Sequence, residues 1–210
     1  LKLHYREYAG PADAPFTVIC VPGLTRNARD FEALAPHVAE RYRVLCVELR
    51  GRGLSQYATD PMTYVPLTYV RDVAALLDHA GVAHAALIGT SLGGMVGMLF
   101  AAMMPTKVLG VIMNDVGTEV DPKGLARIAS YVGKTPPVVT WDDAAKAIQF
   151  LDKAIYPEYR DADWKRLARL RFTENPGGSL RLDYDFNISK TLPSPATSPG
   201  PGPAFERLSD

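Results

Sequence analysis

Strand-like runs of apolar residues recur through the first half of the chain. Residues 16–21 and 42–49 are rich in consecutive apolar positions, as in strands buried on both faces of a parallel sheet. Residues 2–8 alternate apolar and polar positions, which indicates an edge or antiparallel strand. Residues 85–90 and 108–114 add two more apolar runs of strand length. We therefore expect the first half of the chain to be dominated by one sheet.

Helical periodicity lies between these runs. Residues 67–80 carry their apolar side chains on one face and stop before Gly81, a residue typical of helix ends. A shorter helix is expected to begin at Asp30, as its N-cap, and to run to Val38. Helix formers also follow the run over 85–90. Strands that alternate with helices in this way predict an α/β fold, with a mostly parallel, doubly wound sheet covered by helices on both faces.

The pattern changes after Asp115. Residues 122–132, 141–155 and 161–172 predict helices, with no buried strand between them. Helices that arrive after the last strand suit a lid over the C-terminal edge of the sheet, where open α/β sheets bind ligands. The alternative is that they are ordinary helices covering the sheet, and the sequence leaves it open.

These patterns divide the chain into three parts. We expect a core over residues 1–117, a helical lid over 118–190 and a tail over 191–210. Residues 192–203 read LPSPATSPGPGP, and so much Pro, Gly and Ser predicts a linker or disordered tail. The chain begins at Leu1 rather than Met and has no signal-peptide pattern, so we expect a trimmed start.

The turn between residues 85–90 and the next helix carries the candidate chemistry. Gly89-Thr90-Ser91-Leu92-Gly93 has the form G-x-S-x-G and stands between a strand pattern and a helix pattern, as a nucleophile elbow requires. Such a turn holds the serine in a strained backbone conformation, so its neighbours must be small. We expect Ser91 to be the nucleophile, with Gly89 and Gly93 providing room.

Composition narrows the function classes. Lys plus Arg equals Asp plus Glu at 23 each, so we expect neither nucleic acid nor an anionic membrane as partner. No apolar run approaches the ~20 residues of a membrane span.

Cys20 and Cys46 lie in apolar strand runs, and we expect two buried, reduced thiols rather than a disulfide. Reduced thiols favour a reducing, cytoplasmic location. No phosphate-binding glycine motif and no metal-ligand spacing is present, so no cofactor or metal is expected.

Four short motifs stand at the ends of the predicted strands. They are Pro22–Asn27 (PGLTRN), Arg50–Ser55 (RGRGLS), Gly89–Gly94 (GTSLGG) and Asn114–Gly117 (NDVG). Together they resemble the α/β-hydrolase superfamily, and most closely its small esterase and 3-oxoadipate enol-lactonase-like branch. The resemblance covers the chain from about residue 3 to residue 183. It implies the α/β-hydrolase fold, with a helical lid after the family's sixth strand, here residues 108–114, and with the C-terminal strands missing.

The resemblance also implies roles for single residues. Ser91 would be the nucleophile, and the backbone N–H groups of Leu92 and Leu24 would form the oxyanion hole. Gly23 would let the chain approach the substrate oxygen, although many relatives have His-Gly where this chain has Pro-Gly. Thr25 and Arg26 would lie near the pocket mouth, where Arg26 is either a solvated loop charge or a group that recognises a carboxylate.

A base and an acid are needed to activate a serine. In this superfamily both follow the serine along the chain, but every histidine here precedes Ser91: His4, His37, His79 and His84. We expect each of them to be structural. Asp115 is the one acid at a suitable sheet edge. It is either the acid of the site or a residue that caps loop N–H groups, and the second interpretation is favoured.

Two functions follow. The first is a serine hydrolase that cleaves a small carboxylic ester or lactone through an acyl-enzyme on Ser91. Acyl transfer, carbon–carbon hydrolysis and perhydrolysis share this constellation, whereas epoxide hydrolysis and dehalogenation need a carboxylate nucleophile. The second is a catalytically incomplete, hydrolase-like fragment or binding module, because no histidine follows Ser91. A homo-oligomer, or a partner chain that covers an open sheet edge, is a further expectation.

Overall fold

The computed structural model describes residues 1–117, 119, 121–134 and 138–192. Within these residues a five-stranded sheet has the order β1-β3-β2-β4-β5. Its strands are β1 (His4–Tyr8), β2 (Thr17–Val21), β3 (Arg43–Glu48), β4 (Ala85–Thr90) and β5 (Val108–Asn114). Only β1 pairs antiparallel, and the other pairings are parallel. The predicted strands and the antiparallel edge strand are confirmed.

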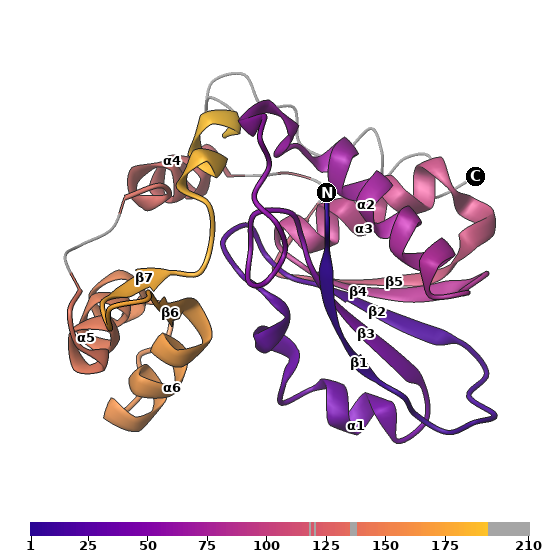
Figure 1. Cartoon of the computed structure of the whole chain (residues 1–210), viewed down its shortest axis with the longest axis horizontal. Helices are drawn as coiled ribbons and strands as arrows, with labels where there is room; N and C mark the ends of the chain where they lie inside the picture. The colour runs from indigo at the N-terminus through magenta and orange to yellow at the C-terminus, as the bar shows by residue number, and fades with distance from the viewer. Residues whose placement is uncertain (118, 120, 135–137, 193–210) are drawn as a thin grey trace.

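Helices lie on both faces of this sheet (Figure 1). The α-helices of this half are α1 (Ala35–Ala39), α2 (Pro66–His79) and α3 (Leu92–Met103). Three 3₁₀ turns connect them to the strands: η1 (Ala28–Phe31), η2 (Pro61–Thr63) and η3 (Pro105–Lys107). In Figure 1, α1 covers one face, and α2 and α3 cover the other. This arrangement confirms the α/β, doubly wound fold class.

The apolar run of β2 is explained by this double cover. Val18 and Cys20 pack with Phe31 against η1 and α1, whereas Ile19 and Val21 belong to the cluster under α2 and α3. All five residues of β2 are buried. Alternate side chains of a strand point to opposite faces, so a strand covered on both sides favours apolar residues at consecutive positions, here Val18 to Val21 after the buried Thr17.

One capping prediction is wrong. Asp30 does not cap a helix, because a 3₁₀ turn intervenes and its N-cap is Asn27, whose side chain accepts from the N–H of Arg29. The following helix α1 begins after Leu34, with no side-chain cap. The carboxylate of Asp30 instead accepts hydrogen bonds from Arg26 at 2.6 and 2.5 Å.

The rest of the described chain forms three helices, a hairpin and a 3₁₀ turn. They are α4 (Pro122–Tyr131), α5 (Trp141–Asp152), α6 (Asp161–Arg171), β6 (Phe172–Glu174), β7 (Leu180–Leu182) and η4 (Phe186–Thr191). The three predicted helices are confirmed. The antiparallel β6–β7 hairpin escaped prediction, because each strand has three residues and only one buried side chain.

This second part is joined to the first through the segment after β7. The carboxylate of Asp183 accepts a hydrogen bond from Arg29 at 2.7 Å, and the N–H of Asp185 donates to the carbonyl of Gly51 at 2.7 Å. The Tyr64 hydroxyl donates to the Asp185 carboxylate at 2.6 Å. The division at residue 117 stays a prediction, and residues 193–210 of the predicted tail lie outside the described residues.

Cys20 on β2 and Cys46 on β3 lie opposite each other in the strand register, and both are free, buried thiols, as predicted.

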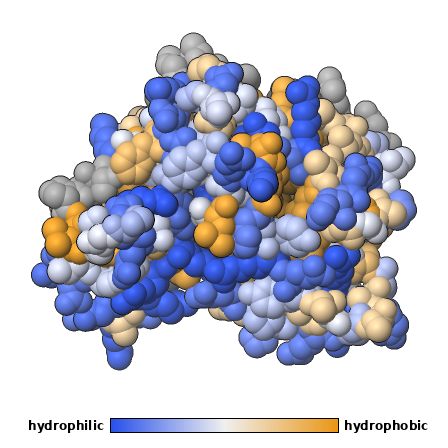
Figure 2. All heavy atoms as spheres, viewed as in Figure 1, coloured by the Kyte–Doolittle hydropathy of each residue, from blue (hydrophilic) through white to orange (hydrophobic). Residues whose placement is uncertain are grey.

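Hydrophilic residues dominate the face shown in Figure 2, and hydrophobic residues form separate small groups between them. Among the described residues, no helix combines the length and apolar character needed to cross a membrane.

Candidate active site

Ser91 has a strained backbone. It lies between β4 and α3 with φ 53° and ψ −116°, and within the described chain only Asp115 shares a positive φ among non-glycine residues. A side chain in this region carries a steric cost that the surrounding packing must offset. The geometry is that of a nucleophile elbow, with the serine directly before the first residue of the helix.

Glycines make this turn sterically feasible. A Cβ atom on Gly89 would overlap the backbone of Gly93, and a Cβ atom on Gly93 would overlap the carbonyl oxygen of Val21 at the end of β2. Both obstacles are backbone atoms, which cannot rotate away. Helix α3 can therefore pack this closely onto β2 and β4 only with glycine at both positions, as the elbow motif predicts.

The loop after β2 runs beside the serine. A Cβ atom built on Gly23 would lie 3.8 Å from the Cβ atom of Ser91. The next residue, Leu24, has a backbone N–H that donates to no acceptor among the described residues. Leu92 is the first residue of α3, where the N–H has no intrahelical acceptor. Two unpaired backbone donors thus flank the serine from two segments.

A buried arginine supports this loop from behind. Arg52 is fully buried, and its Nε donates to the carbonyl oxygen of Leu24 at 2.9 Å. Its Nη1 donates to the Arg50 carbonyl at 2.7 Å and to the Tyr69 hydroxyl at 2.9 Å. The guanidinium also lies 4.9 Å from the centre of the Tyr69 ring. Nε and Nη1 of this cation are hydrogen-bonded, whereas its Nη2 is buried without a partner among the described residues. No carboxylate of the described residues forms an ion pair with it.

Asp115 lies at the neighbouring strand end. Thr90 pairs with Asn114 in the β4–β5 register, so the residues that follow each, Ser91 and Asp115, leave the sheet at the same edge. The N–H of Ser91 donates to the Asn114 carbonyl at 2.9 Å. The Asp115 side chain is exposed and accepts no hydrogen bond from the described residues, and its role, acid of the site or cap of loop N–H groups, stays a prediction.

The four histidines lie elsewhere. His84 precedes β4 at the end opposite Ser91, with Nδ1 2.7 Å from the Thr106 carbonyl oxygen. His79 ends α2 at that same side of the sheet. His4, on β1, is separated from β4 by two strands and lies 3.0 Å from the Glu48 carboxylate. His37 is exposed on α1. No histidine of the described chain stands beside the serine, as predicted.

Arg26 differs from both expectations for it. Its guanidinium is bound in two places by the Asp30 carboxylate, and the side chain is only 17% exposed. It is therefore not a solvated loop charge, and its charge is already balanced by a carboxylate of the chain itself. Thr25 lies where the sequence placed it, at the boundary of a cavity.

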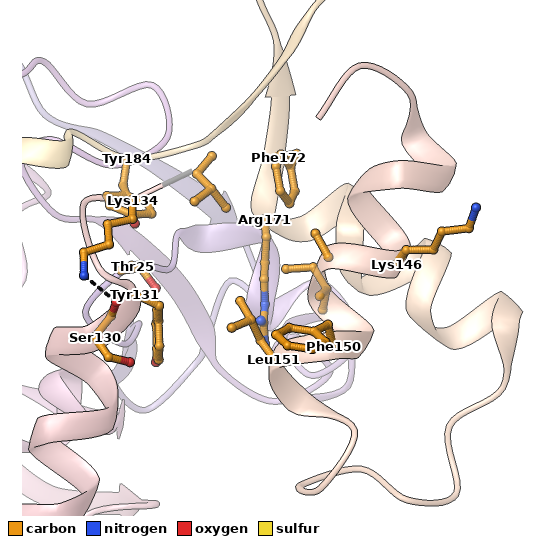
Figure 3. Close-up of a pocket in the computed structure, with 13 residues that line it drawn as sticks. Thr25, Ser130, Tyr131, Lys134, Lys146, Phe150, Leu151, Arg171, Phe172 and Tyr184 are labelled. Atoms are coloured by element: carbon orange, nitrogen blue, oxygen red, sulfur yellow. Dashed lines mark hydrogen bonds between the residues drawn. The ribbon is translucent and has the colours of Figure 1, made fainter. Parts of the chain in front are cut away.

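This cavity extends from the loop into the helical part and has a volume of about 480 Å³. Apolar and aromatic side chains line most of it: Tyr131, Ala147, Ile148, Phe150, Leu151, Phe172, Leu182 and Tyr184. Figure 3 shows Phe172 above Arg171, with Phe150 and Leu151 below it. Pockets of this size and character are typical of small-molecule sites. Thr25 is adjacent in sequence to Leu24, so the cavity begins at the candidate oxyanion loop.

Apart from Thr25, sequence reasoning assigned none of the residues that line the cavity to a pocket, and it missed the role of Arg52. Arg52 belongs to a motif that the sequence singled out, but nothing in the motif says that its side chain reaches Leu24. Arg171 ends an amphipathic helix in a run of basic residues, and such residues are usually exposed. Only the tertiary arrangement of α4, α5 and β6 turns it into a wall of the cavity.

The strand order, the elbow and the cavity define an α/β protein of the hydrolase type, and comparisons with known proteins agree. The model of the α/β hydrolase fold family matches residues 17–181, so the chain belongs to this family. A solved α/β hydrolase from Novosphingobium aromaticivorans superimposes with a TM-score of 0.91 at 44% identity, over 99% of this chain and 73% of that one.

Two curated relatives have named activities. A 3-hydroxybutyrate-oligomer hydrolase from Cupriavidus necator is 32% identical over 79% of this chain and 56% of its own length. The 3-oxoadipate enol-lactonase 2 of Acinetobacter baylyi is 30% identical over 65% of this chain and 51% of its own length. The chain thus spans about half the length of these relatives, and the predicted superfamily and its enol-lactonase-like neighbourhood are confirmed.

Proposed function

We propose that this chain carries the nucleophile and the oxyanion hole of a serine hydrolase that cleaves a small carboxylic ester or lactone. The observation that carries the proposal is Ser91, held at φ 53° beside the unpaired N–H of Leu24. The cost of this strained conformation is understandable if the hydroxyl must project from the sheet edge. Relatives that hydrolyse oligoesters and enol-lactones support the substrate class.

The proposed reaction has two steps. The Ser91 hydroxyl oxygen attacks the ester carbonyl and loses its proton to a base, and the carbonyl oxygen becomes an oxyanion. The N–H groups of Leu24 and Leu92 donate to that oxyanion, and one such donor is worth about 3 kcal/mol of transition-state stabilisation. The alcohol leaves with a proton, and water then attacks the acyl-enzyme to release the acid and restore Ser91.

Asp115 is the proposed acid of the site. It follows β5 as Ser91 follows β4, one position beyond the Thr90–Asn114 pair, and its carboxylate is exposed and free of partners within the described residues. A carboxylate orients the histidine that acts as base. All four histidines of the chain precede Ser91, and this favours a second candidate function, a hydrolase-like module that binds an ester without turning it over.

The deciding experiment follows the release of p-nitrophenol from p-nitrophenyl acetate by the chain and by Ser91→Ala. Steady release that disappears in Ser91→Ala supports the hydrolase. A single burst with a stable acetyl group on Ser91, seen by mass spectrometry, supports the nucleophile and oxyanion hole without a base for deacylation. Release equal to that of Ser91→Ala contradicts the hydrolase and favours the binding module. Thr90→Ala serves as the control for a neighbouring hydroxyl.

Two further proposals concern context. Within the described sheet β5 is an edge strand, and its side chains Leu109 and Ile112 are 56% and 63% exposed. Exposed apolar edges tend to pair with other chains, so we propose that a second copy or a partner chain covers this edge. Sedimentation at several concentrations tests this, and a monomer throughout contradicts self-association.

The two free thiols support a reducing, cytoplasmic location.

A further inference from the structure

The cavity beside Thr25 has an uneven charge. Three of its thirteen lining residues are basic, namely Lys134, Lys146 and Arg171. None of the thirteen carries a carboxylate. Figure 3 shows the Lys146 ammonium pointing away from the cavity, and the Lys134 ammonium donates to the Ser130 carbonyl at 2.9 Å. Arg171 is different, because its side chain is only 19% exposed and extends toward Leu151 and Phe150.

The positive charge of Arg171 is only partly balanced. Its Nη1 lies 2.6 Å from Oδ2 of Asp152, which is the last residue of α5. The other oxygen of this carboxylate lies 3.4 Å from Nη2 of Arg127. One carboxylate therefore serves two guanidinium groups, and the excess positive charge is shared with Arg127, whose side chain is 47% exposed. The neighbouring Arg26 does not change this sum, because Asp30 balances it.

The hydrogen bonds of Arg171 are also incomplete. Its Nε is buried and has no partner among the described residues. A buried donor without an acceptor is costly. A ligand that brings a negative charge into the cavity would balance the excess, and the apolar wall would hold the carbon chain that carries it.

We propose that this cavity binds the carboxylate-bearing part of an acidic monoester, with Arg171 as the specificity-determining residue. The ester carbonyl lies at Ser91, and the chain passes Thr25 to place its carboxylate at Arg171. This assignment of substrate class rests on the proposed function for the position of the reacting carbonyl. It accounts for a buried basic residue in a mostly apolar cavity and for the absence of an acidic lining residue among those described.

The test measures binding without catalysis. Ser91→Ala is titrated by calorimetry with monomethyl adipate and with dimethyl adipate, which share a carbon chain and differ in one negative charge. We expect the monoester to bind about tenfold or more tightly than the diester, and expect raised salt to weaken only the monoester. Equal affinities, or a preference for the diester, overturn the proposal.

Variants of Ser91→Ala locate the preference. Adding Arg171→Gln should abolish the discrimination between the two esters while the diester still binds, and adding Arg171→Lys should restore part of it because the charge returns. Arg166→Gln is the matched control, since Arg166 is exposed on the same helix and outside the cavity. Discrimination that survives Arg171→Gln, or that is lost in Arg166→Gln, overturns the assignment.

The two proposals fail separately. If Ser91→Ala discriminates between the esters but the parent chain hydrolyses none, the cavity assignment stands and the hydrolase proposal fails. If p-nitrophenyl acetate is hydrolysed at Ser91 but the monoester shows no preference, the hydrolase proposal stands and the cavity assignment fails.

Discussion

Arg52 and Leu24 are joined by a hydrogen bond, 2.9 Å long, from the Nε of the fully buried arginine to the carbonyl oxygen of the half-buried leucine. The acceptor belongs to Leu24, the residue whose own N–H we propose as a donor to the oxyanion. A buried guanidinium that forms no ion pair with the described residues costs desolvation energy. That cost is understandable if Arg52 fixes the loop, so that the Leu24 N–H is already in place when the carbonyl oxygen arrives.

Substitution of Arg52 tests this role. We expect Arg52→Met to slow the acylation of Ser91 by p-nitrophenyl acetate more than it weakens diester binding in Ser91→Ala, because the loop loses its support. We also expect a loss of about 1–3 kcal/mol in the free energy of unfolding, because buried acceptors lose their donor. Arg52→Lys keeps one donor and should recover part of the rate. If the acylation rates of the two variants change only in proportion to their free energies of unfolding, Arg52 has a structural role and does not position the loop for the reaction.

Gly93 provides a test of the elbow's packing. We expect Gly93→Ala to destabilise the fold by about 1–3 kcal/mol or more, because its methyl group would overlap the Val21 carbonyl. Gly110→Ala is the matched control on β5, where a Cβ atom meets nothing within 4 Å, and it should change stability by less than about 0.5 kcal/mol. Urea unfolding of both variants checks this, and equal midpoints would refute the packing argument.

Substitution of Gly23 should change the acylation rate of Ser91 without changing the stability of the fold. A Cβ atom here would lie 3.4 Å from the Arg26 side chain and 3.8 Å from the Cβ atom of Ser91, which are tolerable contacts. We expect Gly23→Ala to fold normally but to slow acylation of Ser91 by about 10- to 1000-fold, because its methyl group occupies the approach of the substrate oxygen. Unfolding and acylation are measured on the same sample. Unchanged acylation would place the oxyanion elsewhere.

The positions of the strands and the elbow could be predicted because they depend on local sequence. A strand covered on both faces favours consecutive apolar residues, and the turn at Ser91 needs glycines at fixed offsets. The prediction that Asp30 caps a helix failed because Asp30 lies inside a 3₁₀ turn that begins at Ala28 and has Asn27 as its N-cap. The burial of Arg52 and Arg171 depends on segments distant in sequence, and a charged side chain carries no local signal of such burial.

Buried tyrosines give a prediction at alkaline pH. Burial, and then the hydrogen bond to Asp185, raise the pKa of Tyr64 above its usual value of 10, and burial also raises the pKa values of Tyr69 and Tyr184. Above pH 10 the unfolded chain releases these protons while the folded chain keeps them. The unfolded state then binds fewer protons, so the free energy of unfolding falls as pH rises.

We expect this fall to approach about 1.4 kcal/mol per pH unit for each such tyrosine. Urea titrations between pH 9 and pH 12 measure the slope, and absorbance at 295 nm follows phenolate formation in the folded state. Tyr64→Phe should lower stability at neutral pH, because Asp185 and the N–H of Ala58 lose their hydrogen-bond partner. Above pH 10 its free energy of unfolding should fall less steeply with pH than that of the parent chain, because the contribution of one buried tyrosine is removed. A slope identical to that of the parent chain would mean that Tyr64 ionises equally in both states, which its enclosure beside Asp185 opposes.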